Sequence, residues 1–126
     1  MSWVGSVDAI TLFVNDLEAA RDFYCRAFDQ STIFEDDVSA TFRFGGIMVN
    51  LLQHAAVPEL IEPAVLGSND AGPRSVMTIQ VESVDDRAVD LASKGIALLN
   101  GPMDRPWGPR TLSFQDPDGH VWELAS

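Results

Sequence analysis

The sequence carries the same short pattern twice, once near its start and once past its middle. TLFVNDLE at Thr11–Glu18 and TIQVESVD at Thr78–Asp85 each run from alternating apolar residues into a polar and acidic stretch. Such a stretch is typical of a strand followed by the first turn of a helix. In a chain of 126 residues, two copies of one strand-to-helix unit predict a tandem repeat of a small module.

The first copy predicts a βαβββ module. Residues 7–14 have the composition of a strand, and Asn15 with Glu18 forms a capping box that opens a helix. The apolar positions of that helix fall on one face: Leu17, Ala20, Tyr24, Ala27 and Phe28. Three further strands are expected at about 31–36, 40–44 and 47–53, with a tight turn at Gly45-Gly46 between the last two.

The second copy predicts the same module again. Ser83 and Asp86 open its helix and Gly95 closes it. Asp116-Pro117-Asp118-Gly119 fits a type I turn at each position. The expected strands are 75–81, 96–100, 110–115 and 120–125. Residues 1–126 are therefore expected to form a single domain, with module one at about 6–53, a connection at 54–73 and module two at 74–126.

Composition excludes several classes of partner. Eight basic against nineteen acidic side chains give a net charge of −11, which repels nucleic acid and anionic membranes and favours cationic small molecules. The start of the chain lacks the features of a secretory signal, and no apolar run is long enough for a membrane span. Cys25 is the single cysteine, which fits a reducing compartment. We expect a cytoplasmic protein that binds neither nucleic acid nor membrane.

Three segments carry a resemblance to a known family. They are VNDLEAARDFY at residues 14–24, WGPR at 107–110, and SFQDPDGHVWEL at 113–124. Together they resemble the vicinal oxygen chelate superfamily, which groups glyoxalase I, bleomycin-resistance proteins and extradiol dioxygenases. The resemblance implies an α+β fold in which two βαβββ modules form curved mixed sheets around an open cleft, with helices outside. It also implies a homodimer.

Strand alternation then assigns side chains to the cleft, because successive residues of a strand point to opposite faces. Core-facing positions include Leu12, Val14, Phe42 and Trp122. The expected cleft positions are Ala9, Thr11, Phe13, Thr41, Arg43, Val76, Thr78, Gln80, Thr111, Ser113, Gln115, Val121 and Glu123.

The resemblance also implies where a metal would be held. Metal-dependent members carry His and Glu ligands on the first, fourth, fifth and eighth strands, and these places fall here on Ala9, Asn50, Val76 and Glu123. Only Glu123 among them is a strong ligand. His120 has the wrong strand parity to replace a lost ligand, and His54 lies about 13 Å along the strand from Asn50. We therefore predict that the protein has no metal or other cofactor.

The remaining candidates are ligand-binding residues. Trp107 lies in a loop at 101–109 that is rich in proline and glycine and flanked by a basic pair, Arg105 and Arg110. It is either a stacking surface for a flat ligand or a cap on the sheet edge. Glu123 either has a structural role, paired with Arg43 or accepting hydrogen bonds from threonine and asparagine neighbours, or it contacts the ligand. It is a weak candidate for catalysis, for which no other residue is identified. The predicted binding set is Phe13, Arg43, Asn50, Gln80, Trp107, Ser113 and Glu123.

Three functions fit these observations. The first is metal-free binding of a small organic molecule, cationic or aromatic, as in the bleomycin-resistance branch. The second is a divalent-metal lyase, isomerase or dioxygenase whose ligands lie in another register. The third is a dimeric scaffold with a vestigial cleft. Whether the protein is an enzyme is left open by the sequence.

Overall fold

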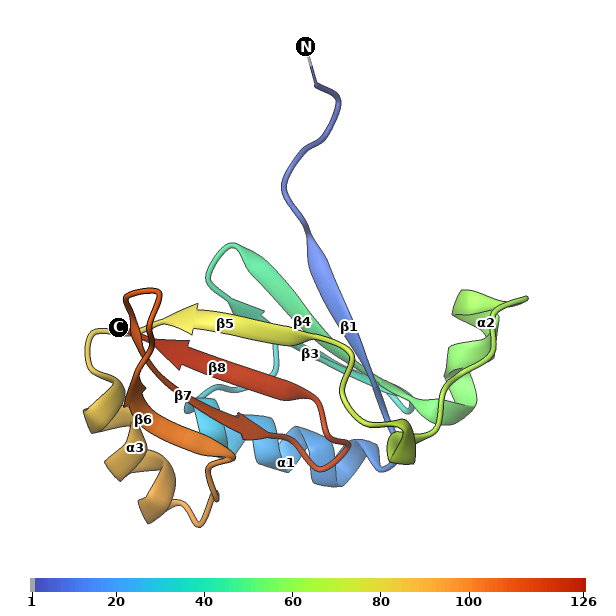
Figure 1. Ribbon diagram of the computed structural model, residues 1–126. Helices are drawn as coiled ribbons and strands as arrows, with labels where there is room; N and C mark the ends of the chain where they lie inside the picture. Colours follow the sequence, from blue (N-terminus) through green and yellow to red (C-terminus); the bar gives the residue numbers. More distant parts are fainter. Residues whose placement is uncertain (1) are drawn as a thin grey trace. The chain divides into compact units, whose positions relative to one another are not determined.

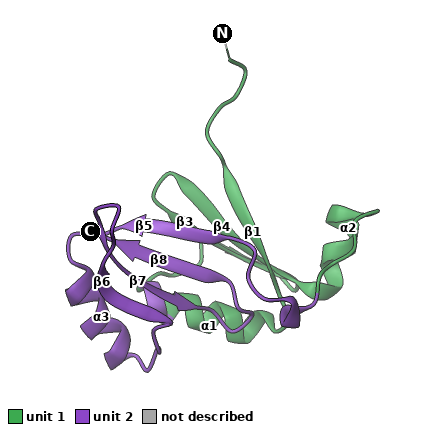
Figure 2. Ribbon diagram, in the orientation of Figure 1, with its two compact units in different colours: residues 1–25, 29–67 green, residues 26–28, 68–126 purple. Residues whose placement is uncertain are grey.

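The computed structural model describes residues 2–126 and contains two four-stranded mixed sheets (Figure 1). The chain divides into two compact units, each built around one of these sheets (Figure 2). Unit 1 comprises residues 1–25 and 29–67, and unit 2 comprises residues 26–28 and 68–126. The expected α+β fold with two βαβββ-like modules is confirmed.

Unit 1 has the strand order β1-β4-β3-β2. β1 is parallel to β4, and β3 is antiparallel to both of its neighbours. The pairing of β1 with β4 brings together strands separated by the helix, as a crossover connection requires. The elements are β1 (Ala9–Val14), α1 (Leu17–Phe28), β2 (Phe34–Glu35), β3 (Ser39–Phe44), β4 (Ile47–Gln53), the 3-10 turn η1 (His54–Ala56) and α2 (Val57–Ile61).

The core of unit 1 lies on one face of this sheet. Leu12, Val14, Phe42 and Leu51 are buried, as the alternation predicts, and the ring centroid of Tyr24 lies 6.0 Å from that of Phe42. The opposite face of the sheet, which we call the non-core face, carries the alternate residues of each strand.

Unit 2 has the strand order β5-β8-β7-β6 and repeats the pairing pattern of unit 1. Its core includes Leu112, Phe114 and Trp122, and the ring of Phe28 lies 5.1 Å from Trp122 between centroids. α3 lies against β6 and β7. The elements are η2 (Asn69–Ala71), β5 (Val76–Gln80), α3 (Val84–Ser93), β6 (Asn100–Asp104), β7 (Arg110–Gln115) and β8 (Val121–Ala125).

The start of α1 differs from the sequence prediction by one residue. The N-cap is Asp16, whose Oδ1 accepts a hydrogen bond from the Ala19 N–H at 3.1 Å. Asn15 instead has its carbonyl oxygen bound by the side-chain amide of Gln53, and the Oε1 of Gln53 accepts from the Leu17 N–H. The predicted capping box of Asn15 and Glu18 was therefore wrong, because β4 supplies the partner for Asn15.

Two other predicted segments differ in the structure. The strand expected at 31–36 is reduced to Phe34–Glu35, since Asp36 folds back to accept hydrogen bonds from the N–H groups of Val38 and Ser39. The expected connection at 54–73 contains η1, α2 and η2.

No helix of the described residues is long and apolar enough to cross a bilayer.

The largest correction concerns β6. The sequence prediction placed this strand at 96–100, whereas it runs over Asn100–Asp104 and takes in half of the predicted Trp107 loop. Gly101, with φ of 86°, passes so close to β7 that a Cβ there would lie 2.4 Å from the carbonyl oxygen of Thr111. Only glycine permits this approach, and the pattern of the sequence gives no sign of it.

Candidate functional site

A row of polar side chains crosses the non-core face of the first sheet. Thr11 in β1 pairs with Asn50 in β4, which pairs with Thr41 in β3. The Thr41 hydroxyl donates a hydrogen bond to Asn50 Oδ1 at 2.8 Å. Each of these three side chains is neutral and only partly exposed. The row therefore offers hydrogen-bonding groups without a charge.

The second sheet carries the equivalent row with a carboxylate at its centre. Thr78 in β5 pairs with Glu123 in β8, which pairs with Ser113 in β7. The Thr78 hydroxyl donates to Glu123 Oε1 at 2.9 Å. In the two registers Thr78 takes the place of Thr11, and Glu123 takes the place of Asn50. Asn100 of β6 pairs with Ser113 and extends the row by one strand.

The positions implied for metal ligands do not fit a metal. Ala9 pairs with Met48 and Val76 pairs with Val121, and both side chains are exposed hydrocarbon without a donor atom. Among residues 2–126, no group of three or more His, Cys, Asp or Glu side chains is placed to hold an ion. A divalent ion bound by several protein ligands needs such a set.

The two histidines lie at the ends of strands. His54 follows β4 in η1. His120 ends the turn before β8, where its N–H donates to Asp116 Oδ1 at 2.9 Å. That turn has the predicted type I hydrogen bond, from the Gly119 N–H to the Asp116 carbonyl oxygen at 3.0 Å. Both histidines lie outside the row of polar side chains, and His120 precedes β8 and is not part of it, unlike in the predicted strand at 120–125.

The other predicted binding residues are divided between the units. Unit 1 contains Phe13, half-buried opposite Leu52 in β4, and Arg43, exposed opposite Met48. Unit 2 contains Gln80, which is exposed at the end of β5. Ser113 and Glu123 are neighbours across β7 and β8. Glu123 belongs to unit 2 and Arg43 to unit 1, and their pairing stays a prediction.

The β6–β7 hairpin holds Trp107 at its turn. Its loop is closed by hydrogen bonds from the Arg105 N–H to the Pro109 carbonyl oxygen at 2.8 Å and from the Gly108 N–H to the Arg105 carbonyl oxygen at 3.0 Å. The Trp107 side chain is 69% exposed, and the Arg105 guanidinium lies 5.6 Å from its ring centroid. Trp107 therefore presents an exposed aromatic surface that makes a cation–π contact with Arg105.

The hairpin also brings Arg105 onto the non-core face, which the sequence prediction missed. A register shift between Asn100 and Met103 adds a residue to β6. As a result, the side chains of Asn100 and Met103 point to the same face as those of Thr111 and Ser113. Arg105 Nε donates to Thr111 Oγ1 at 2.7 Å, and Nη2 donates to Asn100 Oδ1 at 2.8 Å. The basic pair flanking Trp107 was the signal in the sequence, but a bulge is not readable from periodicity.

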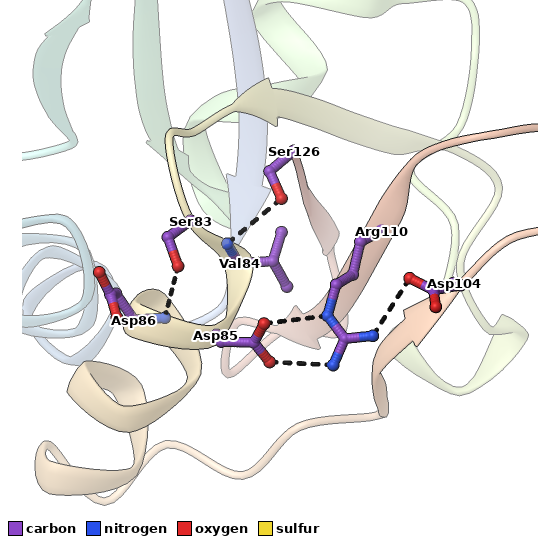
Figure 3. Close-up of polar contacts among 7 residues, drawn as sticks. All are labelled: Ser83, Val84, Asp85, Asp86, Asp104, Arg110 and Ser126. Atoms are coloured by element: carbon purple, nitrogen blue, oxygen red, sulfur yellow. Dashed lines mark hydrogen bonds and ion pairs between the residues drawn. The ribbon is translucent and has the colours of Figure 1, made fainter.

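Arg110 has a different role on the other side of the same hairpin. Its guanidinium holds both carboxylate oxygens of Asp85 at 3.0 Å and Asp104 at 3.2 Å (Figure 3). The hydrogen bond from Arg110 lowers the pKa of Asp85 and, in return, raises the pKa of Arg110. Figure 3 also shows the Ser83 hydroxyl accepting the Asp86 N–H, which caps α3 as predicted. Arg110 thus ties β7 to α3 and to β6.

Cys25 shows no sign of activation. The thiol is partly buried on α1, and burial raises its pKa above the ordinary value. A raised pKa lowers the fraction of thiolate at neutral pH, which is the reactive form.

Two βαβββ-like modules, each with a polar row on the non-core face of its sheet, are the features to compare with known protein families. The family model for the Glyoxalase/Bleomycin resistance protein/Dioxygenase superfamily matches residues 6–124. The chain belongs to this superfamily, as the resemblance of its motifs predicted.

Individual relatives and solved structures are similar to the chain over most of its length. The chain is 29% identical over 119 residues to the uncharacterized protein YraH of Bacillus subtilis, across 91% of this chain and 93% of that protein. It is 23% identical over 124 residues to metallothiol transferase FosB of Staphylococcus saprophyticus, across 96% of this chain and 76% of that protein. A glyoxalase/bleomycin resistance protein/dioxygenase from Nocardioides matches with a TM-score of 0.87 at 23% identity, across 99% of this chain and 85% of that one.

Proposed function

We propose that the protein binds a small organic molecule on the non-core faces of its sheets, without a metal. The observation that carries this proposal is the second sheet, where Glu123 and Ser113 stand in one row beside a hairpin that presents Trp107. A few orienting polar groups next to an apolar aromatic surface are typical of small-molecule sites.

The geometry favours a flat, aromatic ligand that carries a hydrogen-bond donor or a cationic group. The exposed indole of Trp107 offers a stacking surface. Glu123 Oε1 accepts a hydrogen bond from Thr78, which fixes the carboxylate and leaves its other oxygen for a donor on the ligand. The predicted contributions of Phe13, Arg43, Asn50 and Gln80 belong to the same proposal, by analogy with the bleomycin-resistance branch of the superfamily.

The proposal includes a homodimer in the cytoplasm. β1 and β5 each leave one edge unpaired within their own four-stranded sheets, and exposed edges are commonly covered by a partner chain. The single free Cys25 fits a reducing compartment. Light scattering checks the dimer, and a monomer of 13.7 kDa at micromolar concentration contradicts it.

Two measurements test the binding function. Native mass spectrometry of freshly purified protein identifies any molecule that is retained, and titration with flat aromatic amines and bleomycin measures affinity through tryptophan fluorescence. We expect saturable binding that Glu123→Gln weakens. If no molecule is retained and no probe binds, or if a probe binds Glu123→Gln as tightly as the unaltered protein, the scaffold function is favoured.

The metal-dependent enzyme remains as the second candidate because of the relation to metallothiol transferase FosB. It would need donors that Ala9 and Val76 do not supply. Elemental analysis decides between the two: we expect no stoichiometric Ni, Zn, Fe or Mn. About one such ion per chain, lost on Glu123→Ala, would establish the metal-dependent reading.

A further inference from the structure

Arg105 is a half-buried cation whose side-chain contacts are with neutral groups. Within the described part of unit 2, its guanidinium contacts Thr111 Oγ1, Asn100 Oδ1 and the ring of Trp107, and no carboxylate. Arg110, five residues further on, is held by two carboxylates. The difference matters because the chain has nineteen acidic residues, yet within the described part of unit 2 no carboxylate is paired with Arg105.

The contacts of Arg105 fix its orientation but use only part of its hydrogen-bonding capacity. A guanidinium has five N–H donors in a rigid planar fork. Two hydrogen bonds occupy Nε and one donor of Nη2, so both donors of Nη1 and one of Nη2 are left. The guanidinium carbon lies over the ring of Trp107, 5.6 Å from its centroid. A planar fork held in this way is ready to bind a carboxylate through two parallel hydrogen bonds.

We propose that Arg105 binds the carboxylate of an aromatic ligand on the non-core face of the second sheet, with Asn100 and Thr111 as positioning residues. This inference rests on the proposed small-molecule function and adds the chemical class of the ligand. The exposed side chains of Trp107, which contacts the guanidinium, and of Met103, which lies on the same face of the sheet, provide apolar surface for the ring.

Glu123 restricts what the other end of the ligand carries. Asn100, Ser113 and Glu123 are paired across three adjacent strands, so the backbones of Asn100 and Glu123 lie about 10 Å apart. A second anionic group reaching that far would meet the Glu123 carboxylate and be repelled. The ligand is therefore an aromatic monocarboxylate with a neutral or cationic donor at its far end, and not a dicarboxylate whose second carboxylate reaches Glu123.

A matched pair of probes tests this assignment. The pair is 6-amino-2-naphthoate and 6-amino-2-naphthamide, which share the ring and the amine and differ in the carboxylate. Isothermal titration of the full chain should show the naphthoate binding roughly tenfold more tightly, which is the effect of a charge-assisted bidentate pair. Arg105→Gln should remove that preference, and Arg105→Lys should restore part of it. Arg87→Gln, which removes the same charge from the exposed side of α3, should leave the preference unchanged.

A measurement on the unaltered chain guards against misfolding of the variants. In nitrogen-15 NMR, the Arg105 Nε–H signal should move on addition of the naphthoate and stay in place with the naphthamide, while the Arg110 signal stays in place with both. Equal affinity of the two probes, or an unchanged preference in Arg105→Gln, overturns the inference while leaving the small-molecule function in place. Absence of naphthoate binding at millimolar concentration, or equal affinity for inorganic phosphate, also overturns it. Loss of binding of both probes in Trp107→Ala would support stacking on Trp107, which is part of the proposed small-molecule function.

Discussion

The two sheets have the same strand order and the same register in their inner three strands, yet their non-core faces have different chemistry. At the centre of the first row stands Asn50, whose amide accepts a hydrogen bond from a threonine. At the equivalent place in the second row stands Glu123, whose carboxylate does the same. One residue thus turns a neutral row into a charged one, without a change in the backbone pairing.

The outer hairpins increase this difference. In unit 1 the outer strand β2 has only two residues and pairs regularly with β3. In unit 2 the outer strand β6 has five residues and a bulge, which directs Asn100 and Met103 to the same face and brings Arg105 beside them. The comparison teaches that the repeated module conserves its inner three strands as a frame, while chemistry is introduced at the outer hairpin.

The largest expected effect tests the role of that hairpin. Gly101→Ala places a Cβ against the β7 backbone and at a positive φ, so we expect a loss of about 3 kcal/mol of unfolding free energy. Gly45→Ala, in the turn of the first sheet, has the positive φ but open space around the Cβ. It should cost only about 1 kcal/mol. Urea denaturation of both variants measures the difference, and equal losses would show that the close approach of β6 to β7 is unimportant.

The second prediction compares the two aromatic residues of the binding set. Trp107→Ala should weaken binding of a flat aromatic probe by about 1 to 3 kcal/mol, because an exposed indole loses its stacking area. Phe13→Ala should act mainly on stability, since Phe13 is half-buried in the first sheet. Fluorescence or calorimetric titration separates these effects. A larger loss of affinity in Phe13→Ala would move the binding surface to the first sheet.

A third pair of variants compares the cross-strand hydrogen bonds. Thr78→Val removes the donor to a carboxylate, and Thr41→Val removes the donor to a neutral amide. Hydrogen bonds to charged groups contribute more, so we expect Thr78→Val to cost about 1 kcal/mol and Thr41→Val about half of that. Thr11→Val, at the equivalent of Thr78, is the control. The reverse order in thermal denaturation would contradict the contrast between the rows.

The smallest effect concerns acid. Asp85 in unit 2 has its pKa lowered first by the hydrogen bond from Arg110, and Asp36 in unit 1 by the N–H of Val38. Because both folded-state values lie below the ordinary 3.8, their contribution to stability is present above pH 3.8 and is lost as the pH falls further.

Matched amide variants distinguish the two acids. Asp85→Asn should flatten the acid dependence of stability between pH 4 and 2 and remove its sensitivity to salt, since an ion pair is lost. Asp36→Asn should keep most of its hydrogen bonds, because the amide oxygen still accepts them. Denaturation curves at several pH values and two salt concentrations are the measurement. If Asp85→Asn loses stability at low pH in the same way as the unaltered protein, the contribution assigned to the Asp85–Arg110 ion pair is wrong.

The sequence predicted the frame well because the frame depends on alternation. Leu12, Phe42 and Trp122 are buried as their strand parity required, and the repeated pattern at Thr11 and Thr78 correctly indicated two equivalent modules. The Asp116 turn followed from residue preferences that act within four residues. All of these signals are local, so a single sequence is enough to read them.

The parts that sequence reasoning missed depend on contacts between distant residues. The start of α1 depends on Gln53 from another strand, and β6 depends on the close approach of Gly101 to Thr111. The bulge changes the parity of β6, so alternation could not place Asn100 and Arg105 on the same face. For this reason the candidate site was only partly predicted: Glu123, Ser113 and Trp107 were named, and Arg105 was not.

The division of the chain has a consequence for how it folds. Unit 2 is discontinuous, because it includes residues 26–28 as well as 68–126, and Phe28 packs its ring on Trp122 and Phe114. A polypeptide cut between residues 67 and 68 would separate the second sheet from that ring. The fragment 68–126 would then lack three residues of its own unit, and we expect that it does not fold alone. A repeat in the sequence is thus not the same as two separable folding units.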